Sequence, residues 1–328
     1  MEKIGLVGGA GYIGSVAANY FNIKGYKVTI FDSFLFDNKN FFINKDIKCI
    51  NYDSRNFDKN IFKSYDLVID LAAISNDPAG ELDPLLTNKV NVLGRINTVN
   101  SAISSGVKYF IMASSCSVYG ESIQIVDELS TTSPLTTYAK ANLEVEEYIK
   151  SLDINDFNPL IFRQATVFGL SPRLRLDLVV NALIYYGYKE NKIKLLRDGT
   201  QWRPLVGVND LAYLYEALEP NDFIKNRYQV FNIGFNSNNY QIKNLGDEII
   251  SQFKDKPSIE WYGDPDKRSY RVNFSKAENF LPIKKIDTIK KSSKELLEYF
   301  QLNNYELTKF NITLDWYKDL IESKKLVF

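Results

Sequence analysis

Two hydroxyl-bearing residues are the first candidates for chemistry in this 328-residue chain, because it contains no histidine. A general base must therefore be a Tyr, Lys, Asp, Glu or Cys. Ser115 lies in SSCSVYG, directly after an apolar run, and Tyr138 opens the helical stretch TTYAKANLEVEEY. A tyrosine at a helix start, brought beside a serine at a strand end, can take a proton from an alcohol while hydride leaves. From the local sequence alone, a packing role for Tyr138 is the alternative.

Three glycines, Gly8, Gly11 and Gly14, mark a turn between an expected strand, KIGLVG, and an expected helix, SVAANYFNIKG. Glycine has no Cβ, so it accepts positive φ and lets a ligand approach the backbone, as a pyrophosphate at a helix N-terminus requires. The turn also contains a G-x-G-x-x-G match, a pattern that gains weight between a strand and a helix. It therefore predicts a dinucleotide-binding turn.

Asp32 ends the next expected strand, KVTIFD. A carboxylate at this place hydrogen-bonds the adenosine ribose hydroxyls and repels a 2′-phosphate, so the predicted cofactor is NAD rather than NADP. The alternative is an ordinary tight turn followed by a surface aspartate.

Composition excludes several classes of function. Lys plus Arg equals Asp plus Glu at 40 each, so no bulk charge favours nucleic acid or an anionic membrane. No apolar run approaches the ~20 residues that span a bilayer. Without histidine, a histidine-ligated zinc site and a serine-histidine hydrolase are excluded, and no metal site is predicted. Two cysteines and a first strand that begins close to Met1 favour a reducing cytoplasm.

Apolar strands alternate with amphipathic helices over the first 170 residues. Such alternation predicts an α/β fold with a Rossmann-type, doubly wound parallel sheet, whose ligands bind at the carboxyl ends of the strands. Beyond Gly169 the stretches LSPRLRLDLVVNALI, KIKLLRDGTQWRP and WYGDPDKRSYRVNFSKAENF are richer in Arg, Asp and aromatic residues, which indicates a smaller C-terminal substrate-binding lobe. We expect residues 1–170 and 207–236 to form the NAD-binding domain, and 171–206 and 237–328 to form the substrate-binding lobe.

The motifs GGAGYIG, NVLGRIN, SSCSVYG, TTYAKANLEVE, RQATVFG, RPLVGVNDLA and DKRSY follow one another in this order. In this combination the chain resembles the extended short-chain dehydrogenase/reductases that act on nucleotide sugars. With AAISNDPAGELDP and LRDGTQWRP, it more narrowly resembles the GDP-heptose 4-dehydrogenases of bacterial capsule biosynthesis.

The resemblance implies a role for each matched position. The catalytic hydroxyl falls on Ser115 and the base on Tyr138. The implied cofactor-binding residues are Gly8, Gly11, Tyr12, Ile13, Gly14, Asp32, Asp53, Ser54, Leu71, Ala72 and Ala73. The implied substrate-binding residues are Ser117, Thr166, Arg173, Asn181, Arg203 and Arg268. A turn role is the alternative for Asp53 and Ser54, and a solvated surface charge is the alternative for each arginine.

One departure from the family lies in the catalytic motif. The family pattern is Tyr-x-x-x-Lys, but the fourth residue after Tyr138 is Asn142. Lys140 does not replace the lysine, because two residues along a helix point about 200° apart. The family's ammonium stabilises the tyrosinate and binds the nicotinamide ribose, whereas an amide does only the second. We therefore expect slow turnover at neutral pH that depends on Ser115 and the cofactor's charge, and an acid shift of the pH–rate profile in Asn142→Lys.

A second departure narrows the reaction. Related dehydratases have Asp-Glu after the catalytic hydroxyl, where this chain has Cys116 and Ser117. Neither is a good acid for eliminating water, so redox chemistry at a sugar carbon is favoured. GDP-mannose 3,5-epimerases use a nearby cysteine for proton transfer, but theirs aligns with Ser117. A buried structural thiol is the alternative for Cys116.

The sequence thus predicts NAD-dependent oxidation of a GDP-sugar at C4, with a manno-configured heptose as substrate and the 4-keto sugar as product. A nucleotide-sugar 4-epimerase and a non-catalytic dinucleotide sensor are the alternatives. By resemblance, the helices that contain NVLGRIN and YAKANLEVEEY pair between subunits, which predicts a homodimer or homotetramer.

Overall fold

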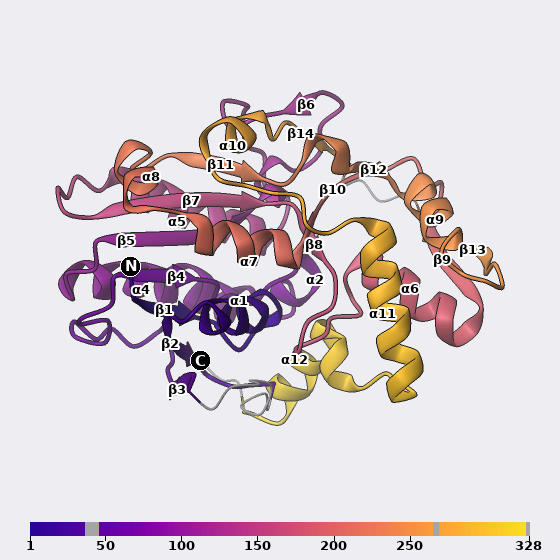
Figure 1. Ribbon diagram of the computed structural model, residues 1–328, viewed down its shortest axis with the longest axis horizontal. Coiled ribbons are helices and arrows are strands. Elements are labelled where there is room, and N and C mark those ends of the chain that lie inside the picture. Colours follow the sequence, from indigo (N-terminus) through magenta and orange to yellow (C-terminus); the bar gives the residue numbers. More distant parts are fainter. Residues whose placement is uncertain (37–45, 265–268, 326–328) are drawn as a thin grey trace.

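A seven-stranded parallel sheet forms the centre of the protein in this computed structural model, which describes residues 1–36, 46–264 and 269–325 (Figure 1). The strand order is β11-β7-β5-β4-β1-β2-β3, and every neighbouring pair is parallel. The order reverses at β1 and β4, which confirms the predicted doubly wound sheet. The strands are β1 (Lys3–Val7), β2 (Lys27–Asp32), β3 (Lys48–Asn51), β4 (Leu67–Asp70), β5 (Tyr109–Ser115), β7 (Asn158–Gln164) and β11 (Val230–Ile233).

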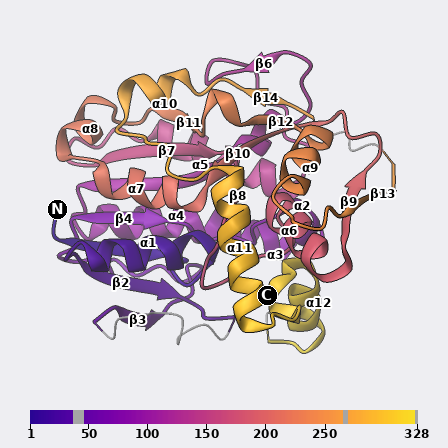
Figure 2. The same ribbon diagram turned by 45° about the vertical axis from the view of Figure 1, so that its right-hand side comes forward.

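Helices cover both faces of this sheet (Figure 2). On one face, α1 (Tyr12–Ile23) and α7 (Val208–Ala217) share a hydrophobic core with β1 and β2. On the other face, α4 (Arg95–Ser104) and α5 (Thr137–Ser151) pack with β4, β5 and β7. α8 (Pro220–Lys225) contacts β7 and adds Phe223 to the core on the side of α1 and α7. Apart from the largely exposed edge strand β3, these strands are buried from both sides, so they read as continuous apolar runs in the sequence.

Two stretches of regular structure are divided. The helical stretch before residue 106 consists of α3 (Pro84–Asn88), a π-helical turn η2 (Lys89–Gly94) and α4. The stretch PLIFRQATVFG breaks at Ala165 into β7 and β8 (Thr166–Phe168). Only β7 stays in the central sheet. β8 instead pairs with β10 (Trp202–Gly207), which in turn pairs with β12 (Asn239–Gln241), and this break carries the chain into the smaller lobe.

The smaller lobe has a hydrophobic core of its own, built from residues of Phe168–Leu205, Ile242–Ile249 and Ile289–Phe300. Its helices surround a two-stranded parallel sheet at the right of Figure 1. The elements are α6 (Val179–Glu190), β9 (Lys192–Leu196), α9 (Ile242–Ile250), β13 (Ser258–Tyr262) and α11 (Ile289–Asn303).

Two segments of the expected smaller lobe pack against the larger one. β14 (Arg271–Val272) pairs with β6 (Ile125–Val126), and α10 (Ser275–Phe280) adds Ala277 to the core of the central sheet. The last helix, α12 (Thr313–Glu322), packs through Trp316 beside the short helix α2 (Asp77–Gly80). The remaining short turns are η3 (Cys116–Tyr119), η4 (Asn236–Asn238) and η5 (Lys309–Asn311). Within the described ranges, no helix has the length and apolarity needed to cross a membrane.

Candidate active site

One large cavity lies at the carboxyl ends of the central strands, between the sheet and the smaller lobe. Its volume is about 820 Å³, and its lining runs from the glycine turn before α1 to Tyr138, Thr166 and Arg203. This is where a doubly wound sheet binds its ligands. Nearly all of the predicted site residues that the structure describes line this cavity.

The glycine turn is shaped for close backbone approach. Gly8 has φ +73°, and a Cβ on it would lie 2.6 Å from the backbone nitrogen of Ala72 at the end of β4. A Cβ on Gly14 would lie 2.6 Å from Gly9 Cα, inside the turn itself. A Cβ on Gly11 would meet only the Gly8 carbonyl, at 3.1 Å, so the rest of its surface is open. Side chains are therefore excluded at the turn where a pyrophosphate would lie against the N-terminus of α1.

Asp32 lines the same part of the cavity, together with Asp53 and Ser54. Its Oδ2 accepts a hydrogen bond from the backbone N–H of Ala10 at 3.0 Å, and Oδ1 accepts one from Phe34 N–H at 2.8 Å. Burial raises the pKa of Asp32, and these backbone donors oppose the effect. A carboxylate fixed beside the glycine turn fits the ribose of a bound dinucleotide.

Asp53 is held by Arg55, whose Nη2 lies 2.6 Å from Asp53 Oδ2. Burial raises the pKa of Asp53, but hydrogen bonds and the charge from Arg55 outweigh it, and the net pKa is lowered. Ile13, Leu71, Ala72 and Ala73 also line the cavity, as expected for cofactor-binding positions.

Tyr12 and Asn181 form a structural link between α1 and the smaller lobe. The Tyr12 hydroxyl donates to the Gly169 carbonyl at 2.6 Å and accepts from Asn181 Nδ2 at 3.0 Å. Asn181 is fully buried, and its Oδ1 accepts from Gly169 N–H at 3.0 Å. Tyr12 lines the cavity but Asn181 does not, because its amide is occupied by these contacts. The structure therefore does not bring Asn181 to the predicted nucleotide-binding surface.

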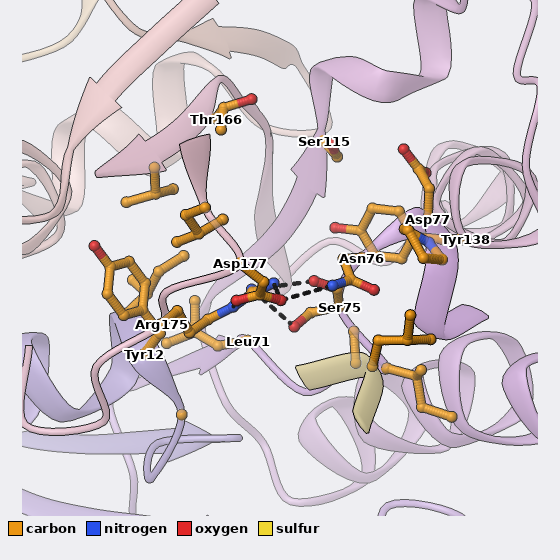
Figure 3. Close-up of a pocket in the computed structure, with 18 of the residues that line it drawn as sticks. Tyr12, Leu71, Ser75, Asn76, Asp77, Ser115, Tyr138, Thr166, Arg175 and Asp177 are labelled. Carbon is orange, nitrogen blue, oxygen red and sulfur yellow. Dashed lines mark hydrogen bonds and ion pairs between the residues drawn. The ribbon is translucent and has the colours of Figure 1, made fainter. Parts of the chain in front are cut away.

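Tyr138 lies in the first turn of α5, which is fixed by its cap. Thr136 Oγ1 accepts from Ala139 N–H at 3.2 Å and donates to Asp77 Oδ1 at 2.6 Å. The Tyr138 ring projects from α5 towards the interior of the pocket, and Ser115 approaches from the end of β5 (Figure 3). Ser115 Oγ accepts from Ser117 N–H at 3.1 Å, which holds it at the strand end.

The ionisation of Tyr138 is set by burial and by its neighbours. Burial raises its pKa, while the positive charge of Arg95 and hydrogen bonding from Asn142 and Ser115 lower it. Asn142 is 1 % exposed and does not line the cavity. Arg95 lies in the NVLGRIN motif but is not among the predicted site residues. The sequence does not show which side chains its guanidinium contacts.

A second polar cluster lies opposite Tyr138 and also went unpredicted (Figure 3). Arg175 pairs with Asp177, with Nη2 and Oδ2 2.8 Å apart, and donates from Nη1 to the Ser75 carbonyl at 3.1 Å. Asn76 Nδ2 donates to Asp177 Oδ2 at 2.8 Å. The cluster ties the loop after β4 to the loop before α6, across one wall of the cavity. The charged run SPRLRLD was its only signal in the sequence.

The predicted substrate-binding residues differ in how well they are partnered. Thr166 lines the cavity from β8, and the buried Ser117 Oγ has no hydrogen-bond partner in the described parts of the chain. Arg173 also lines the cavity, and its Nη1 likewise lacks a partner there. Arg203 lines the cavity and donates to the Trp202 carbonyl at 2.9 Å. Arg268 falls outside the described residues.

Cys116 is fully buried and does not line the cavity. Its Sγ donates to the Arg163 carbonyl at 3.1 Å, and burial raises the pKa of the thiol strongly. Cys116 is therefore a buried structural thiol. It does not face the cavity, so it is not placed to act as an acid or base on a substrate there.

The chain is similar to nucleotide-sugar enzymes both in sequence and in structure. Residues 4–234 match the NAD dependent epimerase/dehydratase family. A UDP-glucuronate 4-epimerase of Thermodesulfobacterium geofontis is 30% identical over 71% of this chain and 69% of its own length. A putative UDP-glucose 4-epimerase of Methanocaldococcus jannaschii is 32% identical over 63% of this chain and 70% of its own length.

Among solved structures, a UDP-N-acetylglucosamine 4-epimerase from Methanobrevibacter ruminantium M1 superposes with a TM-score of 0.81. It is 22% identical, and the match covers 92% of this chain and 99% of that one, which shows the shared fold. The family name specifies NAD. Two features of the site fit this dinucleotide: the glycine turn, which excludes side chains, and the fixed Asp32 carboxylate. The chain therefore belongs to the NAD dependent epimerase/dehydratase family, and NAD is its cofactor.

Proposed function

We propose that this protein is a nucleotide-sugar 4-epimerase that inverts C4 through a transient ketone. The observation that carries the proposal is the position of Tyr138 and Ser115 on the same cavity that the dinucleotide turn opens into. The relatives named above are UDP-sugar 4-epimerases, so a UDP-sugar is the first substrate to examine.

Tyr138 is the proposed general base. Its ionised phenol takes the proton of the C4 hydroxyl, and Ser115 hydrogen-bonds the same oxygen as the carbonyl forms. Bound NAD supplies reversible hydride transfer at this carbon. After the keto sugar turns its other face, Tyr138 returns the proton to the oxygen, so no net oxidation results.

Two groups are proposed to hold the sugar and its diphosphate. Ser117, whose buried Oγ has no hydrogen-bond partner in the described parts of the chain, and Thr166 line the cavity, and their hydroxyls suit sugar hydroxyls. Arg173 and Arg203 suit the diphosphate, because a guanidinium donates two parallel hydrogen bonds to phosphate oxygens. We keep Arg268 as a predicted partner of the same group.

The 4-dehydrogenase predicted from the sequence shares the first half of this reaction and differs in releasing the keto sugar. The comparisons support the epimerase better, and GDP-manno-heptose stays a prediction about the substrate. Elimination of water is disfavoured, because Cys116 is buried and Ser117 carries no carboxyl group.

Product analysis separates these activities. The protein is incubated with NAD and, in turn, UDP-glucose, UDP-glucuronate, UDP-N-acetylglucosamine and a GDP-manno-sugar, and the products are identified by NMR. A C4 epimer without accumulated NADH supports the proposal. A keto sugar with equimolar NADH supports the dehydrogenase, and NAD binding without turnover on any sugar supports a sensor. Tyr138→Phe is the matched inactive control.

We also expect a homodimer or homotetramer formed through α4 and α5, and a cytoplasmic location. A shallow hollow on this face lies between α4 and the segment after α5, and Phe57 at its rim is exposed. Sedimentation velocity measures the oligomeric state, and a monomer at all concentrations would count against this expectation.

A further inference from the structure

Arg95 is among the largest fully buried side chains of the protein, with 1 % of its surface exposed. Its three nitrogens each reach a different element. Nε donates to Asp70 Oδ2, Nη1 to Asn142 Oδ1 and Nη2 to the Ala113 carbonyl, all at 2.8 Å. Thus one guanidinium connects α4 with the ends of β4 and β5 and with the helix that carries Tyr138.

The bond to Arg95 fixes the orientation of the Asn142 amide. A guanidinium only donates hydrogen bonds, so Asn142 must present its oxygen to it. Nδ2 is therefore turned the other way, where it donates to the Tyr138 carbonyl at 3.1 Å, and the hydrogen-bonding influence of Asn142 lowers the pKa of the Tyr138 phenol. A donor held in this way favours the ionised phenol over the neutral one.

Arg95 is also the strongest favourable charge acting on Tyr138. Its partner Asp70 is bonded to Nε, on the side of the guanidinium away from the Nη1 that reaches Asn142. Of the two charges of this ion pair, the positive charge of Arg95 therefore lies nearer to Asn142 than the negative charge of Asp70. A second hydrogen bond, from Ala72 N–H to Asp70 Oδ1 at 3.2 Å, further occupies that carboxylate.

The other charged groups near the start of α5 come from α2, α3, η2 and the loop before α6. Asp77 on α2 raises the pKa of Tyr138, and Glu81 at the end of α2 accepts from Thr137 N–H at 2.6 Å. Arg175 faces the phenol from the opposite wall. Lys140 on α5 itself, Asp83 at the N-cap of α3 and the exposed Lys89 in η2 are also charged, whereas β5 and η3 carry no Asp, Glu, Lys or Arg side chain.

We propose that Arg95 is a positioning residue that, through Asn142, supplies the fixed positive field and the oriented donor that keep Tyr138 competent as a base. The proposal rests on the function proposed above, in which Tyr138 removes the substrate proton. In this proposal the buried Arg95 guanidinium, which contacts α5 through Asn142, stabilises the tyrosinate. In the family this is the role of the lysine at the position of Asn142.

The pKa of Tyr138 itself is the readout, and it needs no substrate. Protein labelled with [ζ-13C]tyrosine is titrated by NMR, and Tyr138→Phe identifies the signal. Replacing the whole ion pair, in Arg95→Met with Asp70→Asn, avoids an unpaired buried charge. We expect the pKa of Tyr138 to rise by roughly one unit, the lower end of the effect of a nearby charge.

Two further variants test the same link. Asn142→Ala keeps the Arg95–Asp70 pair and removes the connecting amide, so it should raise the pKa in the same direction. Arg95→Thr with Asn142→Lys replaces the guanidinium by an ammonium, and should bring the pKa back to the wild-type value or below it.

The matched control is the second buried ion pair of this sheet, Arg163–Glu146, with Nη2 and Oε2 2.7 Å apart. Glu146 lies on α5 about 12 Å along the helix from Tyr138, so Arg163→Met with Glu146→Gln should leave the pKa of Tyr138 unchanged. An unchanged pKa in both the Arg95/Asp70 double variant and Asn142→Ala would overturn the proposal. The titration of Tyr138 needs no turnover. A protein that epimerises no sugar would therefore refute the proposed function, but the measured effect of Arg95 on the pKa of Tyr138 would still stand.

Discussion

The guanidinium carbon of Arg173 lies 3.9 Å from the centre of the Phe36 ring, in the wall of the cavity. Nη2 donates to Thr313 Oγ1 at 3.2 Å, whereas Nη1 has no partner in the described parts of the chain. Burial and the like charge of Arg175 lower the pKa of Arg173 to about 10. A buried cation with an unused donor is costly, so this position favours an anionic ligand group.

Arg173→Met is therefore expected to weaken ligand binding and to stabilise the ligand-free protein by about 1 kcal/mol, because an unsatisfied buried donor disappears. Calorimetric titrations with NAD and with UDP, performed separately, show which ligand loses affinity. We expect at least a tenfold loss for the substrate nucleotide. The control is Arg271→Met, because Arg271 stacks on Trp202 at 5.1 Å outside the cavity. Unchanged affinity for both ligands would contradict the assignment.

Tyr138→Phe should lower the rate of sugar oxidation by roughly 10³-fold, the size expected for loss of a general base. Since burial raises the pKa of Tyr138 and only the ionised phenol is a base, the wild-type rate should increase with pH through the neutral range. Single-turnover formation of NADH, followed at several pH values, measures both effects.

Tyr148→Phe is the matched control for Tyr138→Phe. Tyr148 lies on the same helix, and its hydroxyl donates to Asn100 Oδ1 at 2.6 Å, away from the cavity. It should retain the wild-type rate. A Tyr138→Phe protein with a normal rate and pH profile would show that another group removes the proton.

Asn142→Lys, made alone, is expected to destabilise the protein rather than to shift the pH–rate profile. The new ammonium would lie against the Arg95 guanidinium, which now reaches Asn142 Oδ1 at 2.8 Å, in a site that is 1 % exposed. An uncompensated buried charge costs roughly 3 kcal/mol. Urea unfolding measures this loss, and Asn142→Gln is the uncharged control. A stable Asn142→Lys protein with an acid-shifted profile would support the expectation drawn from the sequence alone.

Asp32→Ser should weaken NAD binding at least tenfold and allow NADP to bind, because the carboxylate that repels a 2′-phosphate is removed. Fluorescence titration with the two dinucleotides measures the change. Asp66→Ser is the control, since Asp66 also accepts two backbone hydrogen bonds, from Glu2 and Lys3, but lies outside the cavity. If Asp32→Ser still bound NAD and rejected NADP like the wild type, Asp32 would have only its structural role in the turn.

The central sheet was predictable because its inner strands are buried on both faces and the turn after β1 carries glycine. Ser115 and Tyr138 could be paired from the sequence, since the end of a parallel strand and the start of the following helix meet at one edge of the sheet. The break at Ala165 was not predictable, because only this one residue separates β7 from β8 and the two strands differ only in their pairing partners.

The parts of the site that were missed depend on distant partners. Arg95 meets Asp70 and Asn142, which are 25 and 47 positions away, and Arg175 meets Ser75 across 100 positions. A motif shows that such a residue is charged but not which group it contacts. Asn181 is the opposite case, since the resemblance implied that it binds substrate, whereas its amide is bonded to Gly169 and does not line the cavity.

Cys116→Ala is expected to preserve catalysis, which tests whether the thiol takes part in it. The side chain is fully buried with its Sγ on the Arg163 carbonyl, so its removal leaves a small cavity that costs roughly 1 kcal/mol. Thermal unfolding should show this loss while the epimerisation rate stays within twofold of the wild type. A thiol reagent should modify only the exposed Cys49 in the folded protein. A tenfold or greater loss of rate in Cys116→Ala, with the fold intact, would restore proton transfer by the thiol as an explanation, because no structural effect of so small a cavity reaches that size.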